Sequence, residues 1–408
     1  MNHILKKTIL FAVGVLLSIP SFSQEEEVVN IPKKFKLADY NYVLGTQMIG
    51  GKYKFTDDSY LIEQAKQVRS MGSNILKISL GNKYTKVYGM KKDESIKTTL
   101  DLVKKKKDFQ KVMDMDFKYI FMWVHTLTDV KWNKGMSTNQ KMKLYREMYD
   151  FTSYLLKEYN NSGKVFMIGN WEGDWLLHGT GKRNIDPSDE KIKNMKEWFQ
   201  IRQAAVDAAK KDVKHKNVQL FHYVEVNLLL KGLEGKKCIA ESILPHVNVD
   251  MVSYSSYEAI KNKNQKKLTE TLKELMDYTE SKLQPKEGIP FKRRVFIGEY
   301  GYPDLQKGAE WQNKMTKMVM ISALELDLPF ALHWEMYNNE YVKDGKNKGK
   351  SKGMSLISEE GVRKPAYYLH KNFYLEMTKY LKDYKKENKK YPVEEEFNQK
   401  ALEYLKSI

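Results

Sequence analysis

Cysteine is almost absent from this chain of 408 residues, with Cys238 as the only one. A single cysteine cannot form a disulfide within the chain, so the stability of the fold must come from its hydrophobic core. A catalytic thiol would need an exposed, electropositive setting and a partner base. The apparent helix Lys236–Glu241 around Cys238 instead predicts a small buried residue without a chemical role.

Arginine is scarce as well, because only seven of the 70 basic residues are arginine. Contacts with base edges and stacked nucleobases favour arginine over lysine, and the chain contains no nucleic-acid-binding motif. We therefore expect no nucleic-acid partner. The lysines that dominate the formal net charge of +18 are spread along predicted helix faces, as on a solvated surface. The sequence leaves open an anionic substrate or an acidic cell-surface polymer as a binding partner, because net charge bears on association rather than on chemistry.

Metal and cofactor motifs are missing too. The histidines are dispersed and form no His-x-x-x-His or His-Glu-x-x-His pair, the spacings that place two ligands on one helix face. No Gly-rich phosphate loop follows a predicted strand. We therefore expect neither a metal site nor a bound cofactor.

The first 23 residues have the features of a secretory signal peptide. A basic stretch precedes an apolar run over Thr8–Ile19, and Ser21-Phe22-Ser23 gives the small-x-small cleavage pattern. The apolar run is shorter than the roughly 20 residues of a membrane span, and no later segment is apolar enough for one. We expect residues 1–23 to be removed and the mature protein to be exported, periplasmic or extracellular, without stable membrane insertion. The pattern predicts no oligomeric state.

From residue 40 onward, strand-like and helix-like segments alternate eight times. The apolar segments that predict strands are Tyr42–Met48, Asn74–Leu80, Tyr119–His125, Val165–Asn170, Val218–Val226, Val249–Tyr254, Val295–Glu299 and Phe330–Glu335. Apolar residues at three- and four-residue spacing predict helices over Tyr60–Met71, Gln140–Glu158, Lys191–Lys211, Leu268–Lys282 and Glu310–Leu326. Strict alternation predicts a parallel sheet with crossover helices. Eight units with polar residues at nearly every strand end favour an α/β fold closed as a (β/α)8 TIM barrel over an open Rossmann sheet.

We divide the chain into a signal peptide at 1–23, one (β/α)8 domain at 24–382, and a charged helical tail at 383–408 packed on the barrel. No internal repeat or low-complexity linker splits it further. The tail contains a predicted last helix over Val393–Lys406. Long strand-to-helix connections should share the face where barrels build their binding clefts; they are Gly81–Glu94, Leu127–Thr138, Gly173–Glu190 and Asn338–Met354.

Two of the apolar strands break into glycine and a carboxylate at their carboxyl ends. Glu172 follows the run Val165–Gly169, and Glu299 follows Val295–Gly298. Continuous apolar strands are typical of a parallel sheet buried on both faces, and residues just past them line the active face of a barrel. A pair of carboxylates delivered this way is the minimum equipment for cleaving a glycosidic bond.

Several segments resemble the clan A retaining glycoside hydrolases, a group of (β/α)8 enzymes with a Glu acid/base after strand 4 and a Glu nucleophile after strand 7. These segments span most of residues 40–375 and are Gly298-Glu299-Tyr300-Gly301, Asp250–Tyr257, His333-Trp334-Glu335 and Gly361–Tyr368. The resemblance assigns no family within the clan. It implies a secreted hydrolase of a poly- or oligosaccharide that acts by double displacement, with Glu299 as nucleophile and Glu172 as general acid/base.

Substrate-binding residues are expected around this pair. The resemblance implies that Tyr257 donates a hydrogen bond to Glu299, that Trp334 stacks on a sugar, and that Asn170 bonds the sugar 2-hydroxyl. Trp334 fits packing at the top of the barrel equally well. Positions at or just after strand ends add further binding candidates: His125, Trp171, Trp175, Glu225 and Glu258. Trp171 and Trp175 would also raise the pKa of Glu172 through their apolar surfaces.

One position departs from the clan pattern. The clan places Asn directly before the acid/base Glu, whereas Trp171 separates Asn170 from Glu172 here. Because side chains alternate along an extended segment, Asn170 and Glu172 would still face the same way. The alternative is a non-catalytic carbohydrate-binding barrel with an aromatic cleft. The displaced Asn170 favours that alternative, and the retention of both glutamates disfavours it.

Overall fold

The computed structural model describes residues 36–128 and 130–408. Eight parallel strands close into a barrel in chain order, each paired with the next and the last with the first. They are β1 (Leu44–Gln47), β2 (Ile75–Leu80), β3 (Tyr119–Val124), β4 (Val165–Gly169), β5 (Gln219–Val226), β6 (Met251–Ser255), β7 (Val295–Tyr300) and β8 (Ala331–His333). The prediction of a (β/α)8 barrel is confirmed. The predicted signal peptide lies outside the described residues.

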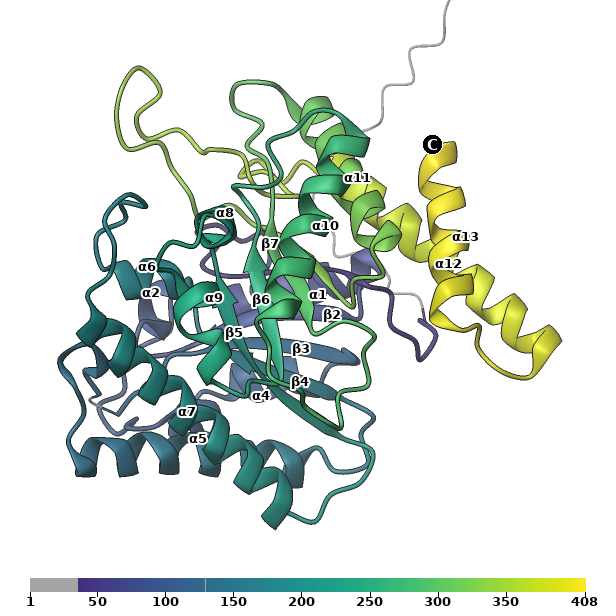
Figure 1. The fold of residues 1–408 in the computed structure, drawn as a ribbon. Helices are drawn as coiled ribbons and strands as arrows, with labels where there is room; N and C mark the ends of the chain where they lie inside the picture. The colour runs from purple at the N-terminus through teal and green to yellow at the C-terminus, as the bar shows by residue number, and fades with distance from the viewer. Residues whose placement is uncertain (1–35, 129) are drawn as a thin grey trace, which may run out of the picture.

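Helices surround the barrel (Figure 1). They are α1 (Tyr60–Met71), α2 (Tyr84–Tyr88), α3 (Thr99–Lys105), α4 (Lys107–Asp114), α5 (Thr138–Glu158), α6 (Gly173–His178), α7 (Asp189–Asp212), α8 (Leu229–Leu233), α9 (Ile239–Ser242), α10 (Gln265–Ser281), α11 (Ala309–Glu325), α12 (Pro365–Asn388) and α13 (Glu394–Ser407), with 3₁₀ turns at Trp132–Lys134 and Leu244–His246. Cys238 is buried directly before α9, at the cap position rather than inside the helix predicted around it.

Two apolar cores form because each strand is covered on both faces. One core lies between the barrel and its helices, and the other fills the barrel interior. Aromatic side chains dominate the interior, where the ring centroid of Phe121 lies 4.9 Å from that of Phe330 and 5.3 Å from that of Phe296. Side chains two residues further along a strand share its face. The layer above this aromatic plug is therefore supplied by inward positions near the carboxyl ends of the strands.

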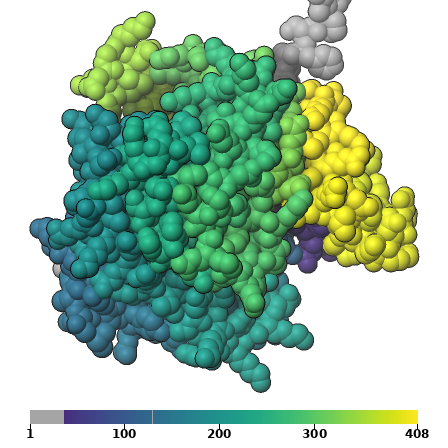
Figure 2. All heavy atoms as spheres, in the orientation of Figure 1, coloured from purple at the N-terminus to yellow at the C-terminus, as the bar shows by residue number. Residues whose placement is uncertain are grey.

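The outer helices give the molecule two distinct sides. Helices α5 and α7 pack along each other on one side of the barrel, as Figure 1 shows. On the other side, α12 and α13 form a projecting lobe (Figure 2), with α13 packed against α11 and α12. Helix α13 is the predicted last helix of the tail. The boundary predicted between residues 382 and 383 falls inside α12, so the tail continues the last barrel helix without a break.

The longest connection runs from the end of β8 to the start of α12, over residues 334–364, and extends well beyond the barrel in Figure 1. The other predicted cleft loops carry α2, the 3₁₀ turn Trp132–Lys134 and α6. All of them leave the carboxyl ends of their strands, the face on which barrel active sites are built. Across residues 36–128 and 130–408, no helix has the length and apolar character needed to span a bilayer.

Candidate active site

Glu172 stands in a strained turn after β4. Its φ of 38° lies in the left-handed region, which costs a non-glycine residue energy and is often found at functional sites. Two hydrogen bonds tie this turn to the neighbouring strand β5. The backbone N–H of Glu172 donates to Glu225 Oε1 over 2.8 Å, and Asn170 Oδ1 accepts the backbone N–H of Glu225 over 3.0 Å. Local structure therefore holds Glu172 despite the Trp171 insertion.

Glu299 lies on β7 where the strand is irregular. The pairing of β7 with β8 shifts register between Ile297 and Tyr300, and such a bulge re-aims the side chain that it carries. Two interior side chains hold the carbonyl oxygen of Gly298, since Gln47 Nε2 donates to it over 3.0 Å and Lys77 Nζ over 3.2 Å. The side chain of Glu299 is buried, with 3% of the residue surface exposed.

Three groups that stabilise an ionised carboxylate surround Glu299. Ser255 Oγ donates to its Oε2 over 3.3 Å, and Lys77 Nζ lies 3.8 Å from its Oε1. Tyr257 also hydrogen-bonds the carboxyl of Glu299, the contact expected from the sequence. Ser255 therefore places a hydroxyl group beside this carboxylate.

The two carboxyl groups interact electrostatically and differ in their surroundings. Burial, followed by the charges of Glu225 and Glu340, raises the pKa of Glu172 to about 7, against the opposing charge of Lys77. Burial, followed by Glu225, raises the pKa of Glu299 well above its usual range, against the opposing effects of Lys77 and the hydrogen bond from Tyr257. When two carboxyl groups interact, the negative charge is favoured on the one that has hydrogen-bond donors around it. Such donors lie at the Glu299 carboxyl, whereas burial raises the pKa of both groups.

A third carboxylate, Glu225, lies fully buried on β5 beside this pair. Its Oε2 accepts hydrogen bonds from Lys77 Nζ over 3.1 Å, from Trp123 Nε1 over 3.0 Å and from Ser253 Oγ over 3.4 Å. Lys77 also lies over the Trp123 ring, 4.2 Å from its centroid. Sequence reasoning proposed Glu225 but missed Lys77 and Trp123. The available signal was a lysine in the middle of an otherwise apolar strand, which is buried only when it is paired.

Aromatic side chains form a wall next to the carboxylates. The ring of Trp123 lies 6.0 Å from Trp334 and 6.2 Å from Trp171, and Trp171 lies 6.4 Å from His125, all between centroids. Trp171 is 37% exposed and Trp334 is 7% exposed, so Trp171 offers more ring surface to a ligand. Burial lowers the pKa of His125 to about 4, and this imidazole is neutral at pH 7. The structure thus brings together three of the predicted aromatic and histidine residues with the unpredicted Trp123.

Two further carboxylates enter the site from the connection after β8. Trp334 Nε1 donates to Glu340 Oε1 over 2.9 Å, and Lys352 pairs with Glu340 Oε2 at 2.6 Å, which together fix the indole. Glu335 is fully buried and accepts the backbone N–H of Asn339 over 3.0 Å. Burial, followed by Glu340, raises the pKa of Glu335 well above its usual range, and Glu299 acts in the same direction. The face around the carboxylate pair is therefore strongly acidic.

The remaining predicted residues make contacts of another kind. The ring contact of Trp175 is with His178 in its own helix, so the structure does not join it to the carboxylate pair. Glu258 accepts the backbone N–H of Leu230 and the Tyr254 hydroxyl, contacts that order the segment after β5. Asp174 accepts three backbone N–H groups, from Asn227, Leu228 and Ile239, and orders the same region.

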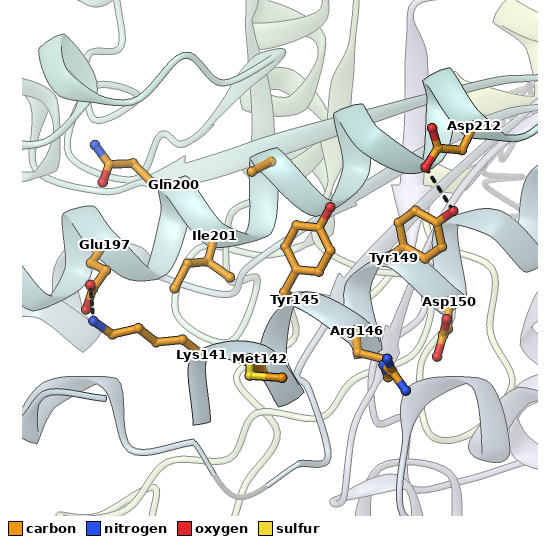
Figure 3. A pocket seen from close by; sticks show the side chains of 11 residues that line it. Lys141, Met142, Tyr145, Arg146, Tyr149, Asp150, Glu197, Gln200, Ile201 and Asp212 are labelled. Atoms are coloured by element: carbon orange, nitrogen blue, oxygen red, sulfur yellow. Dashed lines mark hydrogen bonds and ion pairs between the residues drawn. The ribbon is translucent and has the colours of Figure 1, made fainter. Parts of the chain in front are cut away.

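A groove of about 910 Å³ lies elsewhere, on the outer face between α5 and α7 (Figure 3). Two pairs of its lining side chains contact each other, since Lys141 forms an ion pair with Glu197 and Tyr149 donates a hydrogen bond to Asp212. None of the predicted site residues lines it. Within the described part of the chain, no group of three or more His, Cys, Asp or Glu side chains is arranged to hold a metal ion.

Comparison with known proteins places this geometry in context. No protein-family model and no curated protein matches the sequence. A GH5_18 structure from Bifidobacterium longum subsp. longum aligns with a TM-score of 0.57 at 12% identity, over 83% of this chain and 79% of that one. A GH5_18 variant from Streptomyces cattleya in complex with Manβ1-4GlcNAc aligns with a TM-score of 0.55 at 9% identity, over 81% and 79%. The chain has the fold of clan A glycoside hydrolases.

A second family of the clan gives the same result. A family 39 glycoside hydrolase from Bacteroides cellulosilyticus aligns with a TM-score of 0.50 at 12% identity, over 83% of this chain and 65% of that one. Identities this low relate folds, so the activity of this chain has to be argued from its own residues.

Proposed function

We propose that the protein is an exported glycoside hydrolase that cleaves an oligo- or polysaccharide with retention of configuration. The observation that carries this proposal is the coupled pair of Glu172 and Glu299 at the carboxyl ends of β4 and β7. Burial raises the pKa of both carboxyl groups, and the donors Ser255 and Tyr257 and the cation Lys77 lie at the Glu299 carboxyl. A pair of that kind is what acid-assisted cleavage of a glycosidic bond requires.

In the proposed first step, a Glu299 oxygen attacks the anomeric carbon while Glu172 gives its proton to the departing glycosidic oxygen. The bond to the leaving group breaks, and a glycosyl ester forms on Glu299. In the second step, Glu172, now ionised, takes a proton from water as the water oxygen attacks the same carbon and releases Glu299. Retention requires a separation of about 5–5.5 Å between the two carboxyls, whereas about 6.5–9.5 Å would suit inversion through a water.

Neighbouring side chains have matching roles in this proposal. Tyr257 and Lys77 stabilise the anion on Glu299 before attack. The Nδ2 group of Asn170 is the donor for the sugar 2-hydroxyl, because its Oδ1 is already held by β5. Trp171 and Trp334 supply ring surfaces on which sugar faces stack.

The sugar bound at the cleavage position is proposed to be uncharged. Five carboxylates gather around the site, and among the described residues Lys77 is the buried cation placed between them; they are Glu172, Glu225, Glu299, Glu335 and Glu340. An anionic sugar would be repelled there. The uncharged disaccharide Manβ1-4GlcNAc bound to the Streptomyces cattleya GH5_18 variant is consistent with a neutral substrate.

The test is a panel of neutral, amino and acidic glycans incubated with purified protein, with the products identified by mass spectrometry. We expect cleavage of at least one neutral glycan and none by Glu299→Gln, because an amide cannot form the glycosyl ester. That variant should still bind the glycan, since its shape is unchanged. Turnover by Glu299→Gln near the wild-type rate would remove Glu299 from the nucleophile role. Binding without any cleavage by the wild type would instead favour the non-catalytic carbohydrate-binding barrel.

A further inference from the structure

Most acceptor positions of Glu225 are occupied by the protein itself. Oε2 takes hydrogen bonds from Lys77, Trp123 and Ser253, and Oε1 takes the backbone N–H of Glu172. A carboxylate offers about four acceptor positions, and the residue is fully buried. Full burial keeps the second acceptor position of Oε1 away from a sugar hydroxyl. A binding role, as predicted from its place at the end of a strand, therefore does not fit these contacts.

A mechanical link joins Glu225 to the turn that carries the proposed acid. Its side chain accepts the Glu172 N–H over 2.8 Å, and its own backbone N–H donates to Asn170 Oδ1 over 3.0 Å. These two bonds form a clasp between β5 and the end of β4, on either side of the inserted Trp171. The clasp supports the left-handed backbone of Glu172, which needs surrounding contacts to persist.

An electrostatic link joins Glu225 to both catalytic candidates. Lys77 is shared between two carboxylates, 3.1 Å from Glu225 Oε2 and 3.8 Å from Glu299 Oε1. The charge of Glu225 raises the pKa of Glu172 and that of Glu299, and Lys77 lowers both. The other ionisable groups that act on the pair are Glu340, Glu335 and Tyr257.

We propose that Glu225 is a positioning residue of the active site, whose carboxylate fixes the turn bearing Glu172 and, through the shared Lys77, sets the balance of charge across the pair. This inference rests on the proposed glycosidase function. In this role Glu225 holds the reacting groups in position and does not contact the substrate.

Two substitutions separate the mechanical and electrostatic links. Glu225→Gln removes the charge and keeps an oxygen that can accept the Glu172 N–H, whereas Glu225→Ala removes both. The control is Glu147→Gln, because Glu147 is also a buried carboxylate that accepts backbone N–H groups of a strand-end loop, at Leu127 and Thr128. It belongs to α5 and makes none of the contacts of the carboxylate pair.

The first measurement does not depend on turnover. The carboxyl ¹³C resonance of Glu172, identified by its loss in Glu172→Gln, is titrated by NMR in each variant. We expect a midpoint near pH 7 in the wild type and a midpoint about one pH unit lower in Glu225→Gln, since a neighbouring negative charge has been removed. Glu147→Gln should leave it in place. If Glu225→Gln does not fold, Lys77→Met tests the same link with the opposite sign and should raise the midpoint.

The second measurement is the pH profile of kcat/KM on a cleaved glycan. Glu225→Gln should keep activity within about tenfold at its own optimum, with both limbs moved toward acid. Glu225→Ala should lose about 10²-fold, because a small misplacement of a reacting group has that effect. A Glu172 midpoint unchanged by Glu225→Gln or by Lys77→Met would overturn the inference. A shifted midpoint in a protein that cleaves no glycan would instead contradict the proposed function alone.

Discussion

At the scale of single residues, Glu172 and Glu299 show how two identical side chains can acquire different chemistry. Both are drawn out of water, which raises the pKa of each. Hydrogen-bond donors and a lysine surround only Glu299, whereas the described contacts at Glu172 are made by its backbone. In the proposed mechanism, this difference in hydrogen-bond donors makes Glu172 the acid and Glu299 the anion.

The first prediction concerns the proton on Glu172. Glu172→Ala should lower turnover of substrates with poor leaving groups by about 10²–10⁴-fold and affect activated aryl glycosides much less, because these need little proton assistance. Wild-type kcat/KM for the poor leaving groups should also fall as pH rises through about 7, since the acid form is lost above its pKa. Steady-state rates on the two substrate classes across pH give the measurement.

Azide provides the control for this prediction. It should partly restore turnover of the activated substrate by Glu172→Ala and give a glycosyl azide of retained configuration, because it attacks the glycosyl ester without a general base. Equal losses on both substrate classes, with no azide product, would show that Glu172 has a structural or binding role.

At the scale of elements, the strands could be predicted from the sequence, but the side-chain contacts between them could not. Eight apolar runs located β1 to β8, because burial on both faces leaves a clear signal in a parallel sheet. Lys77, Trp123 and Glu340 were missed. Lys77 on β2 and Trp123 on β3 both acquire their roles from Glu225 on β5, far away in the chain. Single-sequence patterns do not reveal which inward positions will meet across a barrel. The actual place of Cys238 before α9 shows the same uncertainty at element ends.

The second prediction tests how tightly β4 and β5 fit together. A Cβ added at Gly169 would lie 2.3 Å from the ring of Tyr223, which is fully buried inside the barrel. Gly169→Ala should therefore lower the free energy of unfolding by about 1–3 kcal/mol through overpacking. Denaturant unfolding followed by circular dichroism measures this loss.

A double-mutant cycle identifies the contact responsible. In a Tyr223→Leu background the added methyl group has more room, so Gly169→Ala should cost clearly less than in the wild type. The same cost in both backgrounds would mean that the glycine is needed for its backbone rather than for the space beside Tyr223.

At the scale of the whole molecule, the charge of the chain and the charge of the site have opposite signs. The full sequence carries a formal net charge of +18, yet the carboxyl end of the barrel gathers glutamates around Lys77. The lysines on the outer helices are largely solvated, and salt screens their fields within about 10 Å at 0.1 M. The net charge of the protein surface therefore affects which molecules it attracts, whereas the residues of the site determine which sugar is cleaved.

The third prediction follows from the opposite signs of the net charge of the chain and the charge of the site. Of two oligosaccharides with the same linkage, the one with a uronic acid at the cleavage position should show a kcat/KM at least about tenfold lower, because its carboxylate meets Glu340 and the glutamates around Lys77. Glu340→Gln should narrow that difference. Glu376→Gln, which removes one exposed negative charge from α12, changes net charge equally and should leave the difference intact. Competition between the two oligosaccharides in one reaction measures the ratio directly. Faster cleavage of the uronic acid substrate would mean that the lysines, and not the glutamates, govern recognition at the cleavage position.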